Sequence, residues 1–379
     1  MTQVEGFYGP VIGLLIDKLR PRRMVFIGMV IAGAGFVLFS QIQDLWHLYV
    51  AFLILSLGVS VGTWLPMTTV MNHWFTRHKT RAMSLVMEGF AVSGIIVPLL
   101  LAWAIGGSDP NISERYGWRA CALFIGIVCL VSAIPISLLV RNRPADLGLR
   151  PDGDPAFPTS ASPVDADVSP SATEDEGYTL QEAIRTKAFW LISLGLATTT
   201  IVIGTIFVHL GLMLDDRGFS LQTISIVLAV YTAVSAISIP VGGYLGDRLP
   251  IKLVVFGLST LMTLSIVVLV LAHSEEMLFF FAVLFGAGTG RIPVAAALRG
   301  AYFGRKAFAA ITGISAVPMN VLLVIGPVYA GLMHDATGTY DVAFLTIAAT
   351  SLVGSLLFLL LGEPPSRFAR TARSSQAAD

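Results

Sequence analysis

The chain has 379 residues, of which 55% are hydrophobic and 13% are charged, and its 24 basic residues balance its 24 acidic ones. Because an ordinary soluble domain carries about 25% charged residues, this composition excludes a water-soluble globule of this length. The mean hydropathy of +0.78 requires long apolar runs, which predict an all-α polytopic membrane protein.

Eleven apolar runs follow one another along the chain, and each is read as a membrane-spanning helix. Proline inside a run does not count against a span, because neighbouring helices in a membrane bundle can bond the carbonyls that a proline frees. The predicted spans are 6–16, 24–40, 47–71, 82–106, 118–140, 188–214, 222–246, 252–273, 277–304, 307–334 and 341–361.

The distribution of basic residues predicts the orientation. Every second loop is rich in Lys and Arg, and these loops together with the C-terminal tail hold 20 of the 24 basic residues. The positive-inside rule places them in the cytoplasm. Arg291 is the one basic residue that this assignment leaves inside a span. The basic segments are 17–23, 77–81, 141–187, 248–252, 299–306 and the tail after 362.

A phrase near the start of the chain returns in its second half. GLLIDKLRPRR at 13–23 is matched by GYLGDRLPIK at 243–252, with the same spacing from Gly to Asp. Two further pairs are offset by nearly the same stretch of chain: Phe75 with Phe303, and Pro98 with Pro327. Three landmarks in one order indicate a duplicated unit, and therefore two pseudo-symmetric helix bundles.

These motifs carry a family resemblance. Together with RNRPADLGLRPDGD at 141–154, TLQEAIRTKAFW at 179–190, YGWRA at 116–120 and GPVYAGLMHDATGTY at 326–340, the repeated phrase resembles the major facilitator superfamily, in the branch of monocarboxylate transporters and oxalate–formate antiporters. Arg20 departs from the motif, which usually has Gly there. The resemblance implies a gating motif at the cytoplasmic helix ends, made of Gly13, Asp17, Lys18, Arg22, Arg23, Gly243, Asp247 and Arg248.

The resemblance implies twelve helices, and eleven are seen. The second half has a complete helix at 188–214 before the helix that carries its motif, and the first half has no equivalent. We therefore expect the first helix to be missing, through a wrongly assigned start, a fragment or a degraded gene. The expected domains are a five-span N-terminal bundle at 1–140, a flexible cytoplasmic linker at 141–187 that ends in a short helix, a six-helix C-terminal bundle at 188–362, and a cytoplasmic tail at 363–379.

Motifs of enzyme and nucleotide chemistry are absent from the sequence. It has no Walker lysine loop, no His-Glu-x-x-His and no Gly-x-Ser-x-Gly. Gly286, Gly288 and Gly290 lie inside a span with no strand before them, so they indicate close helix packing instead of a nucleotide loop. We therefore expect no enzymatic activity, cofactor, metal, nucleotide or nucleic-acid partner, and any transport would be secondary.

Arg291 lies near the middle of its span, about equally far along the chain from Glu276 at one end and Arg305 at the other. A charge at that depth costs about 2.5–3.5 kcal/mol and normally faces a cavity or a partner. Its planar fork matches a carboxylate, so Arg291 is the first candidate for substrate binding. The alternatives are a structural ion pair, for example with Glu88, or an arginine that caps backbone carbonyls.

Glu88 is the acid well inside a span, and it is either a proton-coupling residue or a structural carboxyl. Asn320 and His209 are weaker candidates for substrate binding. A single Asn or His inside a membrane bundle more often bonds a neighbouring helix, so that alternative stays open for both.

These observations predict a monomeric secondary transporter in a bacterial inner membrane. It would move a small organic anion, similar to a monocarboxylate, across the lipid bilayer by alternating access. The alternatives are a facilitator of a neutral or amphipathic solute, a receptor that does not transport, and an inactive truncated remnant.

Overall fold

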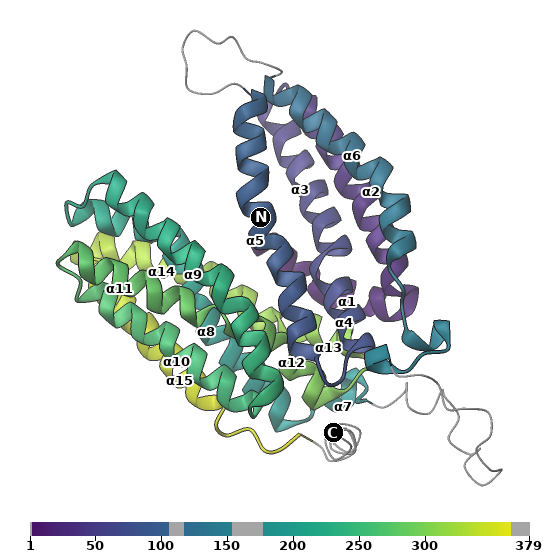
Figure 1. The fold of residues 1–379 in the computed structure, drawn as a ribbon. Coiled ribbons are helices and arrows are strands. Elements are labelled where there is room, and N and C mark those ends of the chain that lie inside the picture. The colour runs from purple at the N-terminus through teal and green to yellow at the C-terminus, as the bar shows by residue number, and fades with distance from the viewer. Residues whose placement is uncertain (1, 106–116, 154–176, 365–379) are drawn as a thin grey trace. The chain divides into compact units, whose positions relative to one another are not determined.

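The computed structural model describes residues 2–105, 117–153 and 177–364, and no β-strand occurs within these ranges. Contacts divide the chain into two compact units that interleave in sequence (Figure 1). The first unit comprises Met1–Thr76, Gly89–Glu176 and Arg305–Ile314, and the second comprises Arg77–Glu88, Gly177–Gly304 and Ser315–Asp379.

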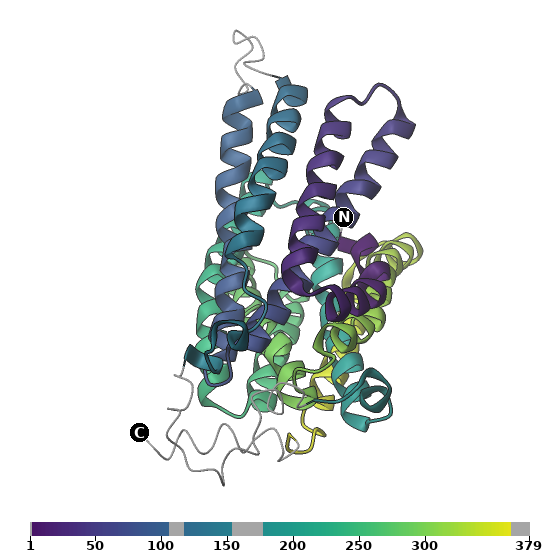
Figure 2. The ribbon, with the colours of Figure 1, turned by 90° about the vertical axis from the view of Figure 1, so that its right-hand side faces the viewer.

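In the first unit, α2 packs along both α3 and α6, and the three helices run side by side in both views (Figures 1 and 2). A small core forms where α1, α2, α3 and α4 meet α13, from Ile12, Ile16, Met24, Val61, Leu65 and Ala309. The helices are α1 (Thr2–Leu19), α2 (Pro21–Ser40), α3 (Leu45–Gly62), α4 (Trp64–Trp74), most of α5 (Lys79–Ile105), α6 (Gly117–Leu139) and α13 (Phe308–Ser315), with short turns η1 (Pro144–Leu147) and η2 (Pro151–Gly153).

In the second unit, α8 packs against α14 and α15, α10 packs against α11 and α15, and α9 packs against α11. Its core is dominated by aromatic and aliphatic side chains such as Phe281, Phe285 and Phe344, all of them fully buried. The helices are α7 (Leu180–Ile184), α8 (Lys187–Asp216), α9 (Leu221–Arg248), α10 (Ile251–Val270), α11 (Glu275–Gly288), α12 (Arg291–Phe303), α14 (Val317–Thr337) and α15 (Asp341–Leu357), together with the start of α5.

Within the described residues, every predicted span lies mostly on helix. Counting α3 with α4, α11 with α12 and α13 with α14, eight of the described helical segments are long and apolar enough to cross a membrane. The remaining predicted spans correspond to α1, α5 and the shorter apolar helix α15. The helical membrane fold is therefore confirmed, whereas the total of eleven spans stays a prediction.

Three predicted spans are interrupted, and each interruption lies just before a proline. The breaks fall between α3 and α4, between α11 and α12, and between α13 and α14. A proline ring collides with the carbonyl four residues earlier, so Pro66, Pro293 and Pro318 oppose continuous helix at positions 62, 289 and 314. Each proline instead lies in the first turn of the new helix. Pro240, by contrast, remains inside α9.

The duplication seen in the sequence is repeated in the helix boundaries. The helices α2 and α10 have the same length, and the offset between their first residues, Pro21 and Ile251, equals the offset between Asp17 and Asp247. The starts of α3 and α11 are separated by the same offset, and those of α5 and α13 differ from it by one position. The two halves of the chain therefore fold with the same pattern of helices, as the repeated motif predicts.

A short helix also forms near the end of the segment that was predicted to be a linker. Thr179 caps α7: its hydroxyl accepts from the N–H of Glu182, and the Glu182 carboxylate accepts from the N–H of Thr179. This capping box confirms the helix expected before 188. Residues 154–176 of the predicted linker lie outside the described residues, so its flexibility stays a prediction.

Candidate functional site

Asp17, in the first copy of the repeated motif, lies at the end of α1. Its Oδ2 accepts a hydrogen bond from the backbone N–H of Ala310 at 3.0 Å. Ala310 is the third residue of α13, and N–H groups in a first helical turn have no partner within their own helix. Asp17 therefore acts as an N-cap supplied by a distant segment, and its charge also interacts favourably with the positive end of the helix dipole.

Gly13 makes this approach possible. A Cβ at position 13 would lie 2.4 Å from the carbonyl oxygen of Ala309, so only Gly lets α1 and α13 come this close. The basic residues that follow are less engaged: Lys18 and Arg23 are exposed, and the backbone N–H of Arg22 donates to Asn142 Oδ1 at 2.9 Å.

Arg20, which replaces the usual Gly of the motif, adopts the glycine conformation nevertheless. Its φ is 70° and its ψ is 144°, a region that residues with a Cβ rarely occupy. The turn between α1 and α2 thus keeps the geometry expected for a glycine, with backbone strain at Arg20.

Asp247, in the second copy of the motif, caps the start of α5 as Asp17 caps the start of α13. Its two oxygens accept from the backbone N–H groups of Thr80, at 2.9 Å, and Arg81, at 3.2 Å. Arg81 Nε also lies 3.5 Å from Asp247 Oδ2, and the Asp247 side chain is only 6% exposed. Gly243 allows this packing, because a Cβ there would meet Ser84 Oγ at 2.5 Å.

Tyr244 joins two cations beside this cap. The guanidinium of Arg81 lies over the Tyr244 ring at 4.6 Å from its centroid, and that of Arg248 lies over the same ring at 4.5 Å. Cation–π contacts of this kind contribute roughly 0.5–1 kcal/mol at exposed sites. The Arg81 contact joins the start of α5 to α9, whereas Arg248 contacts the ring from within α9.

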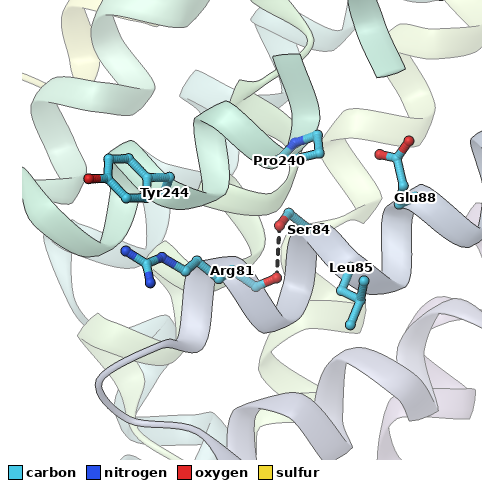
Figure 3. Close-up of a pocket in the computed structure, with 6 residues that line it drawn as sticks. All are labelled: Arg81, Ser84, Leu85, Glu88, Pro240 and Tyr244. Carbon is cyan, nitrogen blue, oxygen red and sulfur yellow. Dashed lines mark hydrogen bonds between the residues drawn. The ribbon is translucent and has the colours of Figure 1, made fainter. Parts of the chain in front are cut away.

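Glu88 lies further along the same face of α5, in a pocket of about 400 Å³ between the start of α5 and α9. The α5 residues Arg81, Ser84, Leu85 and Glu88 line one side, with Glu88 and Arg81 at opposite ends of the row (Figure 3). Glu88 is half-buried, and its Oε2 is shielded from solvent, with no hydrogen-bond partner in the described part of the chain. The pocket walls are otherwise largely apolar.

Arg291 begins α12, directly after the break with α11, and is 3% exposed. Its Nη2 donates to Thr199 O and Thr200 Oγ1, both at 3.3 Å, and its Nε points at Met262 Sδ at 3.5 Å. None of these acceptors is charged. No Asp or Glu in the described part of the chain forms an ion pair with Arg291, so the predicted alternative of a Glu88 pair is not observed. The bond to Thr199 O is of the kind expected from the other alternative, an arginine that caps a backbone carbonyl.

The glycines before Arg291 serve helix packing, as predicted. A Cβ at Gly288 would meet Met262 at 2.5 Å, and one at Gly290 would meet the carbonyl oxygen of Ser238 at 2.5 Å. The glycines let α9 and α10 approach the α11–α12 break closely.

One sequence assignment is wrong. Arg299 was counted with the cytoplasmic loop at 299–306, but it lies inside α12 and is 6% exposed. The helix continues to Phe303, where the Gly304 backbone, with φ 76°, ends it. Arg291 is therefore not the only basic residue buried within a predicted span.

His209 and Asn320 are engaged within the protein. His209 Nε2 lies 2.9 Å from Pro327 O and must donate to it, so Nδ1 is left to accept from the Tyr340 hydroxyl at 3.3 Å. Burial, with Asp216 and Asp335 nearby, raises the pKa of Tyr340, which keeps that hydroxyl a donor. Asn320 Nδ2 donates to Ala316 O in its own helix at 2.8 Å. Both arrangements favour the structural alternative.

Sequence reasoning did not find the partners of the two motif aspartates. Ala310 lies in an apolar run, and Thr80 and Arg81 lie in a basic loop. Neither surrounding sequence indicates that the backbone N–H groups of these residues bond an aspartate. The one available signal was the repeat itself: Ala310 holds the place in the second copy that Thr80 holds in the first, at the same offset as the two aspartates.

Comparison with known proteins agrees with this architecture. The model of the Major Facilitator Superfamily matches residues 4–222 and again residues 210–378. Monocarboxylate transporter 11 of Homo sapiens is 29% identical over 374 residues, covering 94% of this chain and 72% of its own length. Monocarboxylate transporter 13 of Rattus norvegicus is 25% identical over 361 residues, covering 94% of this chain and 77% of its own length.

Among solved structures, the fucose:proton symporter FucP of E. coli has the same fold. It aligns with a TM-score of 0.70 over 95% of this chain and 89% of its own, at 13% sequence identity. The two matches of the family model, the repeated helix boundaries and this shared fold agree with one another. The chain belongs to the major facilitator superfamily and is a membrane transporter, and monocarboxylate transporters are among its relatives.

Proposed function

We propose that this protein is a secondary transporter of a small organic anion, with a monocarboxylate as the first candidate substrate. The observation that carries the proposal is the buried guanidinium of Arg291, whose acceptors among the described residues are all neutral. Its oxygen contacts of 3.3 Å are long beside the roughly 2.7–2.9 Å typical of charge-assisted bonds. A substrate carboxylate would supply both the missing charge and two strong acceptors.

The names of the relatives support the same substrate class, since several are monocarboxylate transporters. Transport by alternating access needs no covalent chemistry on the substrate, so we propose no enzymatic activity. The proposed setting is a bacterial inner membrane, with the protein as a monomer. The distribution of basic residues among the loops favours a cytoplasmic C-terminus.

In this proposal the two motif aspartates are cytoplasmic latches. Asp17 caps α13 and Asp247 caps α5, so each latch joins a motif in one half of the sequence to a helix encoded in the other half. Breaking the caps would expose unpaired N–H groups, at a cost of roughly 0.5–2 kcal/mol each. This free-energy cost is small enough for the free energy of substrate binding to outweigh it.

Glu88 is the proposed site of proton coupling. Its buried Oε2 has no hydrogen-bond donor among the described residues, and it lies in a pocket with largely apolar walls. Glu88→Gln mimics the protonated form. It should abolish uptake driven by a pH gradient while leaving substrate exchange at equal pH intact.

The test of the proposed substrate is uptake into proteoliposomes from a panel of labelled monocarboxylates, dicarboxylates and neutral solutes. Arg291→Ala should abolish anion uptake. Arg291→Lys keeps the charge but loses the planar set of guanidinium donors that matches a carboxylate, so it should weaken anion uptake strongly. Arg141→Ala, which removes an exposed arginine, is the control and should transport normally. Normal anion uptake by well-folded Arg291→Ala contradicts the proposal, and uptake of neutral solutes alone would favour a facilitator.

A further inference from the structure

A second arginine of α12 has the same unbalanced environment as Arg291. Arg299 is 6% exposed, and its Nε donates to Ser315 Oγ at 2.8 Å. The hydroxyl is neutral, and no ion pair with an Asp or Glu is found for Arg299 across residues 2–105, 117–153 and 177–364. The second unit thus buries two guanidinium groups, and its described residues place no counter-charge beside either.

The two charges also oppose each other. Arg299 lies just over two helical turns after Arg291, a rise of about 12 Å along an α-helix, and the positive charge of Arg299 acts unfavourably on that of Arg291. Each arginine side chain is long enough to close part of that distance. Buried charges are normally paired because removing an ion from water is expensive, so the pair is set up to receive negative charge.

A structural role for Arg299 does not account for its charge. The bond to Ser315 joins two segments of the second unit, but a neutral side chain such as Gln could donate to a hydroxyl equally well. The charge is costly at this position, and the hydroxyl does not neutralise it. An anion would.

We propose that Arg299 is a second carboxylate-binding residue, so that the transporter accepts dicarboxylates and holds their two carboxylates with Arg291 and Arg299. This inference rests on the proposed function, because it takes Arg291 as the first carboxylate site. A monocarboxylate uses Arg291 alone. A dicarboxylate neutralises both cations and gains a second set of charge-assisted hydrogen bonds.

The test compares succinate with butyrate, which have the same number of carbons but two carboxylates and one. Binding to the purified full chain in detergent is measured by titration calorimetry at fixed pH and ionic strength. Hydrogen bonds to charged groups are among the stronger ones in proteins, so the wild type should bind succinate roughly 10- to 100-fold more tightly than butyrate. Arg299→Gln should remove this advantage and leave butyrate affinity within about twofold of wild type.

Two further variants separate binding from structure. Ser315→Ala removes the hydrogen-bond partner of Arg299 but keeps the charge, so succinate preference should persist. Arg299→Lys keeps the charge without the fork, and its succinate affinity should lie between those of wild type and Arg299→Gln. If Arg299→Gln does not fold, the Lys variant carries the test: unchanged succinate affinity in it overturns the proposal.

The remaining outcomes are also decisive. Equal affinity of the wild type for succinate and butyrate, or an equal loss of both in Arg299→Gln, overturns the role of Arg299 and leaves Arg291 as the anion site. Undiminished butyrate affinity in Arg291→Ala overturns the proposed function itself. Binding of neither anion by the wild type overturns both.

Discussion

The Asp17 carboxylate and the backbone N–H of Ala310 are joined by a 3.0 Å hydrogen bond between segments far apart in the sequence. Asp17→Ala removes this cap of α13 and should lower the stability of the protein by about 1 kcal/mol. Asp17→Asn is the matched control, because its amide oxygen can still accept the bond and only the charge is lost. Thermal unfolding in detergent should rank wild type above Asn and Asn above Ala, and equal stability of all three would show that the cap contributes nothing.

Arg20 is strained by its backbone, so glycine should suit its position better. A residue with a Cβ in this part of φ/ψ space is destabilised by roughly 1–3 kcal/mol. Arg20→Gly should therefore raise the thermal unfolding midpoint, although the added freedom of the unfolded chain offsets part of the gain. Arg20→Ala removes the same side chain but keeps the Cβ, and it should not be stabilised. An unfolding midpoint of Arg20→Gly no higher than that of Arg20→Ala would contradict backbone strain at Arg20.

Gly13 is required by packing and not by its own dihedral angles. Gly13→Ala would place a Cβ 2.4 Å from the Ala309 carbonyl oxygen, so α1 and α13 must separate and weaken the Asp17 cap. We expect a loss of stability of about 1–3 kcal/mol, as for other overpacked sites. Gly257→Ala in α10 meets nothing within 4 Å and is the control. Similar unfolding midpoints for the two variants would exclude the close approach.

His209 should be a structural residue, since both of its ring nitrogens already have partners. His209→Phe keeps the ring shape but removes the hydrogen bonds to the Pro327 carbonyl and the Tyr340 hydroxyl, at a cost of about 1–3 kcal/mol. Unfolding should occur at a lower temperature, while the affinity for anions stays unchanged. His47→Phe, at an exposed position, serves as the control. Loss of anion binding in folded His209→Phe would return His209 to the substrate site.

The orientation predicted from the basic loops can be tested by labelling. Cys121 and Cys129 are free thiols and are replaced first. A cysteine at the exposed Lys306 should then react with an impermeant maleimide only from the cytoplasmic side, and one at the exposed His273 only from outside. Labelling of both from the same side would overturn the orientation.

The sequence by itself determined the class of the fold and its symmetry. Long apolar runs are satisfied in a membrane as helices, so the order of the helices was readable. The repeated Gly-to-Asp motif predicted that α2 and α10 would have matching boundaries. Local proline chemistry could also have placed the breaks before Pro66, Pro293 and Pro318, because the collision of a proline ring with an earlier carbonyl is a property of the backbone.

Only the tertiary structure decided what the individual polar residues do. The partners of Asp17 and Asp247 are backbone N–H groups at the starts of distant helices, and almost every residue carries such a group, so no side-chain pattern marks them. Arg299 lies beside a basic loop in sequence and is buried in space, because the end of α12 is set by the Gly304 backbone and by packing against neighbouring helices. Hydrogen bonding and burial depend on which segments of the chain pack together. The periodicity of residues along one helix does not indicate which distant segment packs against it.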